Sequence, residues 1–175
     1  MLGTILTNTL SWNKNCSYLI KKVNARMQLL RKVWSFGSTC QEMVHLWKVF
    51  CRSILEQSCV IWDSGLTQEN RNDLERTQKT FLKLILEEDY YNYENALKIS
   101  QLETLDKRRK KLMLSFAQTS LADGMLTDLF PIKKKIHRMK KRNKGRFQVF
   151  HANTERFKKS PILTMQRMLN QAEQP

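Results

Sequence analysis

The chain has 175 residues, of which 31 are Lys or Arg and 16 are Asp or Glu, and its formal net charge at pH 7 is +15. Hydrophobic residues make up 41% of it, enough to bury a core, whereas five Gly and three Pro are too few for a turn-rich β architecture. This charge favours a polyanionic partner, nucleic acid or acidic lipid, without choosing between the two.

Membrane spans and metal sites find no support in the sequence. No apolar run approaches the roughly 18–20 residues that a membrane span needs, and residues 1–10 lack the basic start of a signal peptide. The four cysteines lack the close pairing typical of a structural zinc site. Thiols in a reducing compartment explain them better, so we expect an intracellular protein, and the basic composition is compatible with a nuclear one.

The predicted elements begin with a short strand. Gly3 to Thr7 is β-branched and alternating, which favours a strand, although a single strand needs a partner. Asn13 is predicted to cap a helix that runs to about Phe36, because its apolar residues recur at three- and four-residue steps. That stripe is Leu19, Ile20, Val23, Met27, Leu30, Val33 and Trp34.

Four more helices are predicted before the composition changes. Thr39 and Thr67 are expected to cap the second and third, a small helix includes residues 96–99, and a fifth runs from about 104 to 121. Pro161 can start a last short helix after a basic stretch. The fold class predicted is mainly α, a helical bundle with one N-terminal strand and a basic, partly disordered C-terminal tail.

The positive charge is concentrated on the first predicted helix and in the C-terminal tail. Residues 123–175 hold 13 basic and 4 acidic residues, whereas residues 67–122 hold 10 and 9. A cationic helix face can follow a nucleic-acid backbone, although a solvated helix surface is an equal reading on charge alone. The dense run near the C-terminus is compatible with nucleic acid, nuclear targeting or disorder. The candidate nucleic-acid-binding residues are Lys21, Lys22, Arg26, Arg31, Lys133, Lys134, Lys135, Arg138, Lys140, Lys141, Arg142, Lys144 and Arg146.

Catalytic chemistry is not indicated. A polymerase needs clustered carboxylates for two metal ions, and the aspartates of this chain are scattered. The one acidic cluster, Glu87-Glu88-Asp89, falls at a predicted helix end, where carboxylates are usually solvated. No Gly-rich phosphate loop is present. We therefore expect no enzyme activity, no metal site and no cofactor in this chain.

Short patterns nevertheless follow one another in a recognisable order. A strand-like start is followed by a basic helix and then by a helix that ends in a pattern like Ile-Leu-Glu-Tyr-x-Ser-x-Val-Trp-Asp. A helix with the pattern Leu-Glu-x-x-Gln and a helix with the pattern Leu-x-x-Leu-x-x-Arg-Arg come next. The matching segments are Leu2-Gly3, Leu10-Ser11-Trp12, residues 22–31, residues 54–63, residues 74–86, residues 93–97, residues 102–109, residues 154–162 and residues 165–170.

In this order the patterns resemble the thumb and C-terminal region of jockey-like and CR1-like non-LTR retrotransposon reverse transcriptases. The resemblance spans about residues 2–170 and implies a parent enzyme that copies RNA into DNA. It implies for this chain residues 1–11 as the end strand of the palm, 12–122 as a helical thumb that grips the template–primer duplex, 123–160 as a basic linker and 161–175 as a short C-terminal helix. The missing palm and fingers are then a further expected partner.

The chain departs from the family at informative positions. Met1 stands where an aromatic residue is expected, Asn15 where His is frequent and Gln57 where Tyr is frequent. The family's metal-binding aspartates lie upstream of Leu2-Gly3, so no catalytic residue is carried over and Mg²⁺ would bind at a site absent from this chain. Two other readings remain open, a truncated remnant without function and a basic protein of the nucleus or membrane surface.

Overall fold

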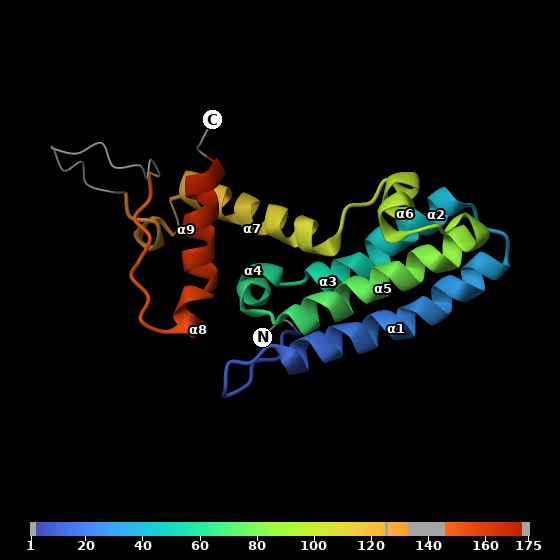
Figure 1. The fold of residues 1–175 in the computed structure, drawn as a ribbon, viewed down its shortest axis with the longest axis horizontal. Coiled ribbons are helices and arrows are strands. Elements are labelled where there is room, and N and C mark those ends of the chain that lie inside the picture. The colour runs from blue at the N-terminus through green and yellow to red at the C-terminus, as the bar shows by residue number, and fades with distance from the viewer. Residues whose placement is uncertain (1–2, 125, 133–145, 173–175) are drawn as a thin grey trace. The chain divides into compact units, whose positions relative to one another are not determined.

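The computed structural model describes residues 3–124, 126–132 and 146–172, and they are mainly helical (Figure 1). The chain divides into two compact units. Unit 1 comprises residues 1–59 and 66–109, and unit 2 comprises residues 60–65 and 110–175. None of the described helices is both long and apolar enough to cross a membrane.

Helix α1, Asn13–Ser35, buries the face that its periodicity predicts. Cys16, Leu19, Val23, Met27 and Leu30 are all buried, and their three- and four-residue spacing places them on one side of the helix. The predicted N-terminal strand is not confirmed, because residues 4–7 do not pair with any described segment. Their backbone is held by a side chain instead.

That side chain belongs to α1. The Ile5 N–H donates to the Asn15 Oδ1 atom at 3.0 Å, and the Thr7 hydroxyl donates to the Ser11 carbonyl at 3.0 Å. Without a partner strand, the β-branched residues at the start have no ladder to join, so local side-chain contacts fix them.

The second predicted helix forms in three parts. It comprises α2, Cys40–Leu46, a π-helical segment η1, Trp47–Arg52, and α3, Ser53–Glu56. The predicted cap at Thr39 is confirmed and is a full capping box: the Glu42 N–H donates to the Thr39 hydroxyl at 3.3 Å, and the Thr39 N–H donates to the Glu42 carboxylate at 2.8 Å. A π-helical turn is rare and is frequently found at functional sites.

Helix α5, Gln68–Leu86, begins at the predicted Thr67 cap, whose hydroxyl accepts from the Asn70 N–H. The α5 side chain Phe81 stacks on Trp47 of η1 with ring centroids 4.6 Å apart and planes 10° from parallel. Both rings are fully buried and form the centre of unit 1. The remaining elements are α4 Cys59–Trp62, η2 Asp63–Gly65, η3 Glu87–Asp89, α6 Tyr93–Ser100, α7 Leu105–Ala122, η4 Thr127–Leu129, α8 Glu155–Lys158 and α9 Pro161–Ala172.

Unit 2 has its own small core, formed by buried side chains from α7, α9 and the segments between them. Phe130 and Phe147 lie within the range predicted as a linker, yet both are buried in this core and meet edge to face at 6.5 Å. The other buried members are Met113, Ala117, Met165 and Leu169.

Two buried amides of α9 organise unit 2. Asn170 accepts from the Phe147 N–H at 2.8 Å and donates to the Phe147 carbonyl at 3.0 Å. One turn earlier, Gln166 accepts from the Phe150 N–H at 3.2 Å and donates to the Leu129 carbonyl at 2.7 Å. The two amides thus supply backbone partners that a neighbouring strand would otherwise provide.

Candidate nucleic-acid interface

The four candidate residues of α1 are all exposed, but they do not share one face. Lys21 and Arg26 are five residues apart, which separates them by about 140° around a helix of 3.6 residues per turn. None of Lys21, Lys22, Arg26 and Arg31 forms an ion pair with any residue that the structure describes. Their charges are therefore available to an external anion.

Arg26 and Lys22 lie on the side of α1 that faces η1. The Arg26 guanidinium donates to the Phe50 carbonyl at 3.0 Å and lies 5.9 Å from the centre of the Phe50 ring. The Lys22 ammonium lies 4.5 Å from the centre of the Tyr18 ring. These cation–π contacts orient both cations while leaving them in solvent.

Lys21 lies on the other side of α1, in a groove shared with α5. The groove has a volume of about 560 Å³, and Ser17, Lys21 and Asn24 line it from α1. From α5 it is lined by Asp73, Arg76 and Thr80. Arg76 is a groove cation that sequence reasoning missed, because α5 is nearly neutral overall and only the pairing of the two helices brings Arg76 beside Lys21.

The two helices are held parallel by a polar contact at each end (Figure 1). At the start, the Asn70 amide donates to the Asn13 Oδ1 atom at 2.8 Å. At the finish, the Trp34 indole N–H donates to the Glu87 carboxylate at 2.8 Å. Glu87, predicted as merely solvated, thus fixes the far end of α1.

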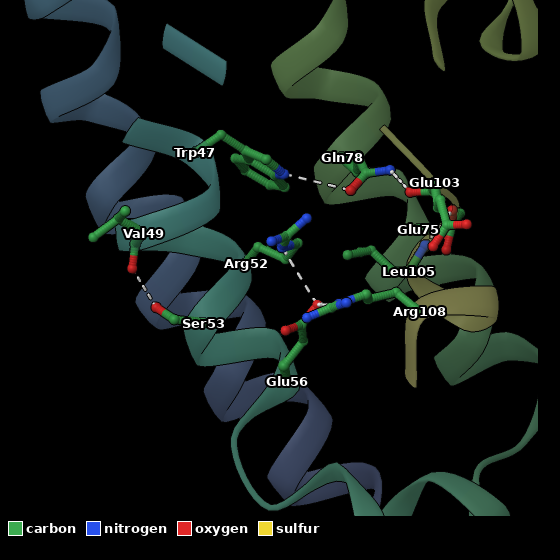
Figure 2. A network of polar contacts seen from close by, with 10 residues as sticks. All are labelled: Trp47, Val49, Arg52, Ser53, Glu56, Glu75, Gln78, Glu103, Leu105 and Arg108. Atoms are coloured by element: carbon green, nitrogen blue, oxygen red, sulfur yellow. Dashed lines mark hydrogen bonds and ion pairs between the residues drawn. The ribbon is translucent and has the colours of Figure 1, made fainter. Parts of the chain in front are cut away.

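Three of the segments that carry the family resemblance, 54–63, 74–86 and 102–109, contribute residues to a polar network, which Figure 2 shows. Gln78 is fully buried; its amide donates to the Glu103 carbonyl at 2.8 Å and to the Tyr93 hydroxyl at 3.0 Å, and it accepts from the Trp47 indole at 3.4 Å. Glu75 accepts from the Tyr93 hydroxyl and, at 3.1 Å, from the Leu105 N–H. Burial, followed by the Glu75 carboxylate, raises the pKa of Tyr93.

Ion pairs fasten the first turn of α7 to the same unit. Glu56 lies 3.0 Å from Arg108 and 3.3 Å from Arg52, and Arg71 lies 2.7 Å from Asp106. The Leu-Glu and Leu-x-x-Leu-x-x-Arg-Arg patterns therefore supply contacts that hold helices together.

Of the basic run near the C-terminus, only Arg146 falls within the described residues. It is exposed, and its guanidinium lies 5.6 Å from the Phe147 ring centre. Ile132 and Phe147, on either side of the run, form an antiparallel bridge, and the Gln148 N–H donates to the Pro131 carbonyl at 2.7 Å. Lys133, Lys134, Lys135, Arg138, Lys140, Lys141, Arg142 and Lys144 lie outside the described residues.

Among the residues that the structure describes, the four cysteines form neither a disulfide nor a metal-binding group. Cys16, Cys51 and Cys59 are buried, Cys40 is half-buried, and none forms a disulfide. Burial raises the pKa of Cys51 to about 11, against a smaller opposing effect of Arg26. Within the described residues, no group of three or more His, Cys, Asp and Glu side chains is arranged to hold a metal ion.

No protein-family model, curated protein or solved structure matches this chain. The resemblance to retrotransposon reverse transcriptases therefore stays a prediction that rests on the ordered patterns alone. The mainly helical fold is shown by the structure itself.

Proposed function

We propose that this chain is a helical nucleic-acid-binding module, similar to the thumb of a jockey-like or CR1-like non-LTR reverse transcriptase, and that it grips a template–primer without catalysing. The observation that carries the proposal is the composition and exposure of α1. Residues 1–41 contain six Lys and Arg residues and no Asp or Glu. In the part of the chain that the structure describes, the four candidate cations on α1 are exposed and form no ion pair.

A basic helix without acidic side chains can contact phosphates without electrostatic repulsion from its own residues. Lysine and arginine that neutralise phosphates release condensed counterions, which drives binding without reading sequence. The basic run from Lys133 to Arg146 adds nine further cations to the chain. In this proposal it increases affinity for RNA or DNA in the same sequence-independent way.

The polymerase part of the proposal rests on the order of the patterns and on the polar contacts that join three of them. Glu56, Glu75 and Gln78 come from two of the patterns, and each contacts the segment 103–108, which belongs to a third. Residues from separate sequence patterns that stabilise the same contacts are expected if the patterns belong to one fold. The palm and fingers, with their Mg²⁺ site, would be partners supplied outside this sequence.

Salt dependence tests the proposal. The affinity for a fluorescent RNA–DNA primer–template is measured by anisotropy between about 50 and 200 mM salt; if about six phosphates are neutralised, log affinity falls against log salt with a slope of about −5 on a duplex. Replacing Lys21, Lys22, Arg26 and Arg31 by Gln should weaken binding and flatten the slope. Lys98→Gln, on α6, is the control and should change the slope by no more than about 0.9, the value for one phosphate contact on a duplex.

Two outcomes overturn the proposal. Binding indifferent to salt would show that phosphates are not the ligand. Tighter binding to vesicles of anionic phospholipid than to the primer–template would favour the membrane-surface alternative, since acidic lipid attracts the same charges.

A further inference from the structure

A stripe of hydrogen-bond donors runs along the side of α1 that faces the groove. Ser17, Lys21, Asn24, Gln28 and Arg31 are all exposed and recur at steps of three or four residues. That spacing places them in one line along the helix. No acidic residue of α1 interrupts the line, and the half-buried Ile20 is the one apolar residue of α1 among those that line the groove.

The opposite wall of the groove has its own cation. Arg76 of α5 is 75% exposed at its side chain and pairs with Asp73 at 3.1 Å through one nitrogen. A guanidinium has five N–H donors, so an exposed pair of this kind leaves most of them for another acceptor. The Thr80 hydroxyl is committed, since it donates to the Arg76 carbonyl at 2.9 Å.

The groove is formed before any ligand arrives. The Asn13–Asn70 and Trp34–Glu87 contacts fix α1 against α5 at both ends, and the buried α1 side chains Val23 and Met27 hold the middle. A ligand that enters therefore orders few side chains, which lowers the entropic cost of binding.

We infer that the groove between α1 and α5 is the track for the sugar–phosphate backbone of one nucleic-acid strand, with Lys21 and Arg76 on opposite sides of it and Arg31 further along. This inference rests on the proposed function and specifies its site. Lys21 and Arg31 are ten residues apart, or about 15 Å at 1.5 Å per residue. At a rise of 3.4 Å per nucleotide along the axis of a stacked strand, this distance corresponds to about four nucleotides.

The position of Asp73 gives the inference a test with an unusual sign. A carboxylate in the groove repels a phosphate, so Asp73→Asn should tighten binding. General loss of structure cannot produce that result. Glu94→Gln removes one negative charge from an exposed position on α6 and is the matched control. Interaction energies of exposed charges, about 0.2–1 kcal/mol, predict a gain in affinity of about 1.4- to fivefold for Asp73→Asn and less for the control.

The experiment measures the dissociation constant of the full chain for a labelled oligo(dT) single strand and for a duplex of equal length. Lys21→Gln/Arg76→Gln should lower the salt slope by about 1.4 on single strands and about 1.8 on duplex. A double variant outside the groove, Lys98→Gln/Lys107→Gln, should change it less. Circular dichroism confirms that each variant is folded.

The results separate this inference from the proposed function. If the unmodified chain binds neither nucleic acid, both fail. If it binds, but groove and control variants behave alike and Asp73→Asn gives no gain over Glu94→Gln, the groove assignment is overturned while the proposed function stands. A groove effect on single strands alone identifies the strand that the track accepts, and an effect on both identifies the backbone as the shared ligand.

Discussion

Replacing Gln78 by Leu should destabilise unit 1 by about 3 kcal/mol. The side chain is fully buried, and its bonds to the Glu103 carbonyl at 2.8 Å and the Tyr93 hydroxyl at 3.0 Å are of normal length. Losing the bond to the Tyr93 hydroxyl costs about 1 kcal/mol, and leaving the part-buried Glu103 carbonyl without its donor costs about 1–3 kcal/mol. The Trp47 contact at 3.4 Å adds little, and the apolar leucine offsets part of the loss.

Urea denaturation followed by tryptophan fluorescence measures this cost, because the buried Trp47 ring lies against Phe81 and reports on the same contacts. The midpoint should fall while the slope with urea stays constant. Gln118→Leu, at an exposed site on α7, is the control and should shift stability by less than about 0.5 kcal/mol. A loss below about 1 kcal/mol for Gln78→Leu would refute the reasoning, since it would mean that the Glu103 carbonyl finds another donor.

Other regions give independent tests. Asn170→Leu removes both amide bonds to the Phe147 backbone in unit 2, so tryptic cleavage after Arg146 should accelerate, with a stability loss of about 2 kcal/mol. Hydrogen bonds with Thr39 lower the pKa of Glu42, so the ionised Glu42 carboxylate stabilises the fold at neutral pH and this stabilisation is lost as the pH falls below about 4. The difference in unfolding free energy between the wild type and Glu42→Gln should therefore disappear over that pH range. Under native conditions at pH 8 a thiol reagent should modify half-buried Cys40 well before Cys51, whose pKa burial raises to about 11; equal rates would contradict this order.

Local chemistry accounts for what the sequence predicted well. The capping residues Thr39 and Thr67 and the apolar spacing of α1 each act within a few residues, so they are readable without the fold. The strand predicted at residues 4–7 is not formed in this structure, because a strand needs a partner strand and local propensity does not show whether one is present.

The groove depends on information that no single segment contains. Arg76 sits beside an acidic residue on a near-neutral helix, and only the parallel pairing of α1 with α5 brings it to Lys21. The core of unit 2 was hidden for a different reason. Gln166 and Asn170 look like surface residues of a short helix, and their burial follows from backbone groups more than ten residues away.

The bridge between Ile132 and Phe147 joins two residues that are fifteen positions apart in the chain. Closure of a chain segment costs free energy only as the logarithm of its length, about 0.6 kcal/mol for each doubling. The bonds between Phe147 and Asn170, together with the bridge itself, offset this cost within unit 2. The contacts that hold Phe147 therefore also set the distance between the two residues that flank the basic run.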